Sequence, residues 1–160
     1  MKRSQHILAI AGLALAVWAM AYGFYYAVWI EHQTLDHIGG SLAASFQHAA
    51  LREAAASQAS LADYARAKAV YTREVDAHSH WIGLAMILMV LAALWNRLSF
   101  GEGMRGLLAV ALIAGAYLFP LGVLLQNHVG GGIGQGIAVG ATGLLIAAFG
   151  TVAFGFARQR

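Results

Sequence analysis

Residues 106–126 read GLLAVALIAGAYLFPLGVLLQ, a run that contains no Asp, Glu, Lys or Arg. A helix needs about 20 mainly apolar residues to cross the hydrocarbon core of a lipid bilayer. The run meets this length, and it lacks the polar face that a surface helix of a soluble protein carries. It therefore predicts a helix that spans a membrane.

Three further segments share the length and apolar character of this run, and they cover residues 7–30, 81–98 and 133–157. Across the chain, 60% of the residues are hydrophobic and 11% are charged, against about 45–50% and about 25% in ordinary soluble domains. The sequence predicts an all-α integral membrane protein, in which residues 1–160 fold as one membrane domain with a four-helix bundle.

The composition also excludes several classes of function. The chain has no cysteine, so it has no disulfide, no thiolate metal ligand and no thiol redox chemistry. Its net charge of +3 is small, and its basic residues are scattered or lie near the termini. No basic cluster indicates nucleic-acid binding.

The short connections predict the orientation, because cytoplasmic connections carry an excess of Lys and Arg. Both termini and the connection between the second and third segments are basic, through Lys2, Arg3, Arg97, Arg105, Arg158 and Arg160. We therefore expect both termini on the cytoplasmic side of a bacterial-type inner (plasma) membrane. Residues 31–80, in which acidic residues balance the basic ones, are then expected outside.

The outer residues are expected to form a helical hairpin over about 41–78, since a structureless loop of this length is unusual in a compact fold. Residues 41–56 are rich in good helix formers, and residues 60–63 (SLAD) resemble a capping box that starts a second helix. This pattern predicts a break near residues 57–59. Gly39 and Gly40 are expected to let the chain bend after the first span.

Glycines are frequent in the fourth apolar segment, where Gly132, Gly136 and Gly140 are spaced four residues apart. Small residues at this spacing allow two helices to approach closely, so they predict tight helix packing. The alternative is that a flat cofactor occupies the space left by the missing side chains.

Six of the seven histidines lie in the outer stretch or at outer ends of the apolar segments: His32, His37, His48, His78, His80 and His128. Imidazole is a common ligand of haem iron and of borderline metals. The candidate cofactor ligands are His32, His78, His80 and His128. The candidate metal ligands are His32, Asp36, His37, His78, His80 and His128. An interfacial or hydrogen-bonding role is the alternative for each ring.

The spacing of these residues limits how they cooperate. His32 and Asp36 are four residues apart and share a helical face, so Asp36 can orient His32 or join it as a ligand. His78 and His80 are two residues apart, and on a helix they point about 200° apart. They can bind one ion only if the helix begins after His78; otherwise they serve different sites, or one of them is structural.

The segment HSHWIGLAMIL, residues 78–88, resembles the H-x-H-x-x-x-L-G-M pattern of certain small uncharacterised membrane proteins. Over about residues 76–127, the chain is also distantly similar to the haem-ligating helix starts of subunit I of haem–copper oxidases. Haem in those oxidases is held by histidines on two separate helices, so the resemblance implies His80 or His78 as one axial ligand. The chain departs from the oxidases in having too few spans for their core and no recognisable binuclear copper ligands.

The combined expectation is a membrane redox protein that binds b-type haem near its outer face, with His80 or His78 opposite His32 or His128. As a membrane oxidoreductase, it would transfer electrons between quinol and an outer acceptor. One alternative fills the site with copper or zinc. Another is a non-catalytic sensor or assembly subunit, in which the hairpin binds a partner and the glycines support association with other subunits or with a second copy.

Overall fold

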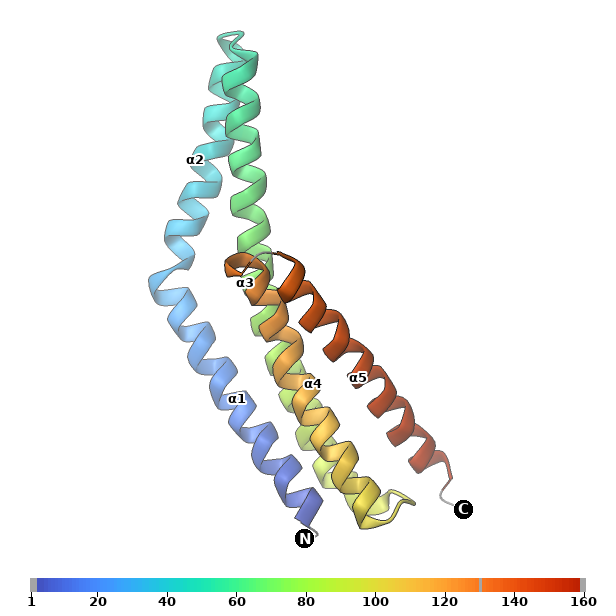
Figure 1. Cartoon of the computed structure of the whole chain (residues 1–160). Coiled ribbons are helices and arrows are strands. Elements are labelled where there is room, and N and C mark those ends of the chain that lie inside the picture. Colours follow the sequence, from blue (N-terminus) through green and yellow to red (C-terminus); the bar gives the residue numbers. More distant parts are fainter. Residues whose placement is uncertain (1–2, 130, 159–160) are drawn as a thin grey trace. The chain divides into compact units, whose positions relative to one another are not determined.

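The computed structural model describes residues 3–129 and 131–158, and its regular structure there is entirely helical (Figure 1). The elements in chain order are α1 (Arg3–Trp29), α2 (Glu31–Ala50), α3 (Ala54–Leu94), the short 3-10 helix η1 (Trp95–Arg97), α4 (Glu102–His128) and α5 (Gly131–Ala157). The prediction of an all-α fold is confirmed.

Four helices are long and apolar enough to cross a membrane, as the sequence predicted: α1, α3 together with η1, α4, and residues Gly132–Ala157 of α5. Large apolar side chains are exposed on each of them, including Met20, Val90, Val110 and Ile146, which are 59–68% exposed. A soluble protein rarely exposes so much contiguous apolar surface, whereas lipid tails are as apolar as these side chains. The helix surfaces are therefore suited to contact with hydrocarbon.

The chain forms two compact units. Unit 1 comprises residues 1–20 and 76–160, which include the start of α1, the apolar part of α3, α4 and α5. Unit 2 comprises residues 21–75, which include the end of α1, α2 and the first part of α3. The single membrane domain expected over residues 1–160 stays a prediction.

Within unit 1, α4 and α5 pack with their backbones in close contact. A Cβ added to Gly122 would lie 2.5 Å from the backbone nitrogen of Ala138, and one added to Gly134 would lie 2.6 Å from that of Gln126. Only glycine permits this approach. The buried side of α5 repeats at alternating four- and three-residue intervals, the spacing of a coiled-coil seam: Gly134, Ala138, Ala141, Leu145, Ala148, Val152 and Gly155.

The sequence predicted close packing at Gly132, Gly136 and Gly140, and this prediction is wrong for the described part of the chain. A Cβ added to any of these three glycines would meet nothing within 4 Å. Residues two positions apart point about 200° apart on a helix, so Gly136 and Ala138 lie on different faces. α5 does pack closely, but through a different set of small residues.

One end of unit 1 is closed by polar contacts between the first residues of α1 and the end of α3. The indole of Trp95 is fully buried and donates to the hydroxyl of Ser4 (3.1 Å). The side chain of Gln5 donates to the carbonyl of Ala92 (2.9 Å) and accepts from the amide of Asn96 (2.8 Å). We call these residues the Trp95 cluster.

Arg105 joins the Trp95 cluster from the first turn of α4. Its side chain is 5% exposed, and its guanidinium donates to the backbone carbonyls of Asn96 and Leu98. The last carbonyls of a helix lack partners within the helix, and a cation near them is favourable. Arg105 therefore completes the end of α3 and η1, and fixes the start of α4 against it.

In unit 2, α2 and the first part of α3 lie side by side and run antiparallel (Figure 1). The hydroxyl of Ser45 donates to the carbonyl of Ser57 (3.1 Å), and the hydroxyl of Ser57 donates to the carbonyl of Ser45 (3.0 Å). Further along the pair, the Tyr71 hydroxyl donates to the Glu31 carboxylate (3.2 Å). Hydrogen bonds thus join these two helices at two separate levels.

A tight turn at residues 51–53 ends α2. Arg52 has φ 64°, in the left-handed region that favours glycine. Its N–H donates to the carbonyl of Ala49 (3.0 Å), and the N–H of Glu53 donates to the carbonyl of His48 (2.9 Å). This pair of bonds is the Schellman pattern, which satisfies carbonyls at the end of a helix.

The sequence placed this break near residues 57–59, and that prediction is wrong. α3 is already helical from Ala54, so residues 60–63 lie inside it and do not form a capping box. Gly39 and Gly40 lie inside α2 and end no helix. Backbone hydrogen bonds stabilise the turn at residues 51–53, although these residues include neither Gly nor Pro.

Candidate ligand sites

The predicted ligands are divided between the two units. They are His32, Asp36 and His37 in unit 2, and His78, His80 and His128 in unit 1. Among the described residues, no group of three or more His, Asp or Glu side chains is arranged to hold a metal ion. The surroundings of each candidate therefore decide what it can bind.

His80 has the best-defined surroundings. Its Nδ1 lies 2.6 Å from the backbone carbonyl of Asp76, one turn earlier in α3. A carbonyl oxygen only accepts hydrogen bonds, so Nδ1 carries the proton and the neutral ring has its lone pair on Nε2. The exposed ring meets Phe119 of α4 edge to face, with centroids 4.8 Å apart. Metal-ligating histidines are commonly fixed in this way, by a carbonyl on the second ring nitrogen.

His78 points away from His80. Because α3 is continuous through both residues, the helix does not begin after His78, and the two rings point about 200° apart. His78 is half-buried, and its Nδ1 is buried with no hydrogen-bond partner among the described residues. Such an atom is unfavourable. The two imidazoles therefore lie in different surroundings. The Nδ1 atom of His78 has no hydrogen-bond partner among the described residues.

The remaining histidines of the outer set are more open. His32 and Asp36 are both exposed, and no hydrogen bond joins them in the described structure. His128 is exposed in the last turn of α4. His48 is different, because its Nδ1 lies 2.6 Å from the carboxylate of Glu53. This contact ties α2 to the turn and gives His48 a structural role.

A groove of about 690 Å³ lies between α4 and α5. Its lining includes Phe119, the ring that His80 contacts, and two carboxamides, those of Gln126 and Gln135. None of the lining residues is charged. Neither carboxamide bonds to another side chain or carbonyl in the described part of the chain. The groove therefore combines apolar walls with a few uncommitted polar groups, as ligand sites do.

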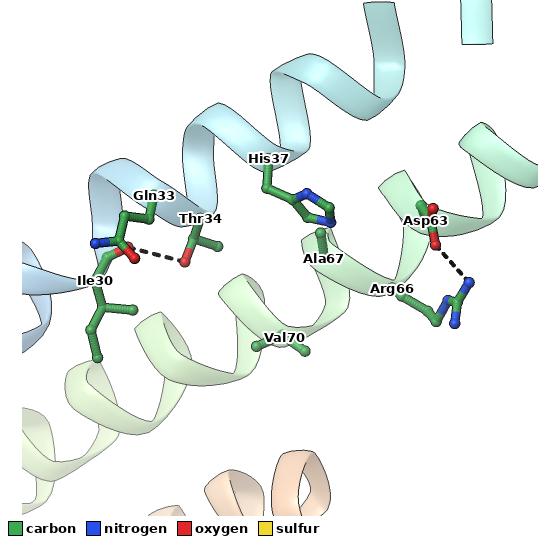
Figure 2. Close-up of a pocket in the computed structure, with 8 residues that line it drawn as sticks. All are labelled: Ile30, Gln33, Thr34, His37, Asp63, Arg66, Ala67 and Val70. Carbon is green, nitrogen blue, oxygen red and sulfur yellow. Dashed lines mark hydrogen bonds and ion pairs between the residues drawn. The ribbon is translucent and has the colours of Figure 1, made fainter. Parts of the chain in front are cut away.

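A second cavity, of about 440 Å³, lies between α2 and α3 in unit 2 (Figure 2). Figure 2 shows His37 reaching from α2 toward Ala67 of α3, near the ion pair between Asp63 and Arg66 (2.6 Å). The small side chains of Thr34 and Ala67 leave this hollow between the helices. Because the guanidinium repels cations and the carboxylate is already paired, the cavity offers little to a metal ion at His37.

Sequence reasoning missed the groove between α4 and α5. Gln126 ends the third apolar segment, and Gln135 lies near the start of the fourth. Their side chains line one groove only because of the rotation and packing of two helices, which hydropathy does not specify. The available signal was an uncharged polar residue inside each apolar segment.

No family model, curated protein or solved structure matches the chain. The resemblance of residues 78–88 to haem-ligating helix starts therefore stays a prediction.

Proposed function

We propose that this protein crosses a bacterial-type inner (plasma) membrane four times, with both termini in the cytoplasm. The four long apolar helices and their exposed apolar side chains support the membrane location. The basic residues near both termini and between α3 and α4 support the orientation. Residues 31–75 then form an extracytoplasmic helical hairpin.

Within this arrangement, the protein is a redox protein that binds b-type haem through His80. The supporting observation is the bond from Nδ1 of His80 to the carbonyl of Asp76, which directs the ring and leaves Nε2 available. The second ligand is expected to be His128, which belongs to the same unit, because the ring of His78 points away from that of His80. Haem supplies reversible one-electron chemistry. The protein would then transfer electrons between quinol and an outer acceptor.

Copper and zinc are the alternative occupants, since histidine and carboxylate ligands suit both metals. A zinc site needs three or four protein ligands, whereas haem needs one or two beyond the porphyrin. The described residues contain no three-ligand group. This difference favours haem over zinc.

Purification of the full chain from cells supplied with haem tests the proposal. The wild-type protein is expected to contain near-stoichiometric iron and to show a Soret band. His80→Ala is expected to remove most of that band. His48→Ala is the matched control and is expected to retain it, because the His48 ring pairs with Glu53. A wild-type protein with neither iron nor a Soret band overturns the haem proposal, and copper or zinc in its place supports the alternative.

A second candidate function is that of an assembly subunit. Phe46 and Leu51 are 68% and 69% exposed near the turn that joins α2 to α3. In an extracytoplasmic hairpin these side chains would face water, which favours a protein partner that covers them. If Phe46→Ser with Leu51→Ser lowers the mass of the purified assembly, while histidine variants leave its metal content unchanged, this function replaces the redox proposal.

A further inference from the structure

The groove between α4 and α5 has two carboxamides at one end, and the rest of its lining is apolar except for Thr142, whose hydroxyl donates to the carbonyl of Ala138 (2.8 Å). Gln126 lies two residues before the end of α4, and Gln135 lies four residues after the start of α5. Both are close in sequence to the connection between the helices. Phe119 lies seven residues before Gln126, about 10 Å along the axis, and Ile146 lies eleven residues after Gln135, about 16 Å along it. A ligand that fits this pattern has a polar head and an apolar tail.

The charge of the lining limits the head to a neutral group. None of the lining residues is ionisable, and an unpaired charge in an apolar site is very unfavourable. A phospholipid phosphate therefore lacks a counter-charge in this groove. A neutral head that bonds to the two carboxamides fits this lining.

Carboxamides suit a head that exists in two hydrogen-bonding states. The amide N–H of Gln126 or Gln135 can donate to a carbonyl oxygen, and the amide oxygen can accept from a hydroxyl. A quinone presents carbonyl oxygens and a quinol presents hydroxyls. The same two side chains can therefore hold both oxidation states without any change of charge.

The groove also adjoins His80. Phe119 lines the groove, and the centroid of its ring lies 4.8 Å from the centroid of the His80 ring. A ligand in the groove is thus separated from the proposed haem ligand by one aromatic side chain. Such a position is suitable for an electron donor to a cofactor held by His80.

We propose that the groove between α4 and α5 binds a neutral quinol or quinone, with its head at Gln126 and Gln135 and its apolar tail along Phe119, Val139 and Ile146. This inference rests on the proposed redox function for its biological meaning. Binding itself depends only on the groove. It can therefore be measured without haem.

Two glycines of α5 provide a matched test of this site. Gly143 lines the groove, and a Cβ at this position would meet nothing within 4 Å, so Gly143→Leu fills the groove without a backbone clash. Gly140 also has nothing within 4 Å and does not line the groove, so Gly140→Leu adds the same side chain elsewhere on α5. Equal thermal unfolding of the two variants shows that both fold.

The experiment measures binding of a short-tailed benzoquinone to the purified full chain in uncharged detergent, by equilibrium dialysis. Gly143→Leu, and Gln126→Leu combined with Gln135→Leu, are each expected to weaken binding at least tenfold. Gly140→Leu is expected to leave binding within twofold, and so is Gln33→Leu, which removes a carboxamide from the cavity between α2 and α3 instead of from this groove. Equal binding to wild type and Gly143→Leu, or no binding to wild type, overturns the inference.

The same preparations separate this inference from the proposed function. Quinone binding that is sensitive to Gly143→Leu in a protein without iron supports the groove and overturns the haem proposal. Haem in the wild-type protein without quinone binding supports the haem proposal and overturns the groove. Release of a phospholipid by Gly143→Leu, with no quinone binding, also overturns it.

Discussion

At the scale of single residues, the chemistry of His80 depends on a backbone atom. The carbonyl of Asp76 sets the tautomer of the ring, whereas the carboxylate of Asp76 takes no part in that bond. Sequence reasoning identified His80 as a candidate ligand. A sequence does not show which oxygen of Asp76 faces the ring.

The Asp76→Asn variant tests whether the backbone carbonyl or the carboxylate of Asp76 positions the ring. It keeps the backbone carbonyl one turn before His80, so the ring is expected to remain oriented and the haem content to stay at the wild-type level. The measurement is the ratio of Soret to protein absorbance in matched preparations. A loss as large as that of His80→Ala would show that the carboxylate, and not the carbonyl, positions the ring.

Arg52 allows a second prediction at this scale. A left-handed backbone conformation costs an L-residue about 1–2 kcal/mol, and glycine avoids this cost but loses more entropy on folding. With φ 64° at Arg52, Arg52→Gly is expected to stabilise the fold by about 0.5–1 kcal/mol. Thermal unfolding followed by circular dichroism measures the change. Arg52→Ala keeps the strained conformation and is expected to give no gain.

At the scale of helices, α5 shows why periodicity did not identify the packed face. Gly134, Ala138 and Ala141 are buried against α4, whereas Gly132, Gly136 and Gly140, which are also regularly spaced, have open space where a Cβ would lie. Both sets are small enough for close packing. Which set packs depends on the rotation of α5 about its axis, and in this structure the rotation places Gly134 and Ala138 against Gly122 of α4.

Substitution by alanine is therefore expected to change stability very differently at Gly122 and at Gly136. Gly122→Ala places a Cβ 2.5 Å from the backbone nitrogen of Ala138 and is expected to cost about 1–3 kcal/mol, because neither backbone can yield easily. Gly136→Ala adds its methyl group in open space and is expected to change stability by less than about 0.5 kcal/mol. Unfolding in mixed micelles compares the two. Equal effects would contradict the close packing of Gly122 against α5.

The reciprocal bonds between Ser45 and Ser57 give a prediction for the pairing of α2 and α3. Ser45→Ala removes the hydroxyl that donates to Ser57 and is expected to cost about 0.5–1.5 kcal/mol. Ser41→Ala is the control, since the Ser41 hydroxyl bonds only to carbonyls of its own helix. Amide hydrogen exchange in α2 and the start of α3 reports the difference. Slower exchange in Ser45→Ala than in Ser41→Ala would contradict it.

At the scale of the whole molecule, hydropathy predicted the bounds of α1, α4 and α5 within about four residues. The third segment was expected at 106–126 and lies in α4, Glu102–His128. The second was expected at 81–98, yet its helix α3 begins at Ala54, because hydropathy marks the part of a helix suited to lipid and not its polar extension. The groove at Gln126 and Gln135 was not predictable, since it requires two helices in a particular rotation.

The orientation in the membrane can be tested by labelling, because the chain has no cysteine of its own. Gln58→Cys places a thiol at an exposed position in α3, and Gly103→Cys places one at an exposed position in the first turn of α4. A membrane-impermeant maleimide is expected to label only Gln58→Cys in intact spheroplasts and both variants after lysis. Labelling of Gly103→Cys alone before lysis would reverse the proposed orientation.

The Trp95 cluster has a consequence for synthesis on the ribosome. Ser4 and Gln5 are made at the very beginning, but the groups that satisfy them belong to Trp95, Ala92 and Asn96. The first helix can enter the bilayer early, yet its polar start must wait for some ninety further residues before it docks. The nascent chain therefore assembles in a fixed order. Ser4 and Gln5 can form their hydrogen bonds only after the end of α3 and η1 has been synthesised.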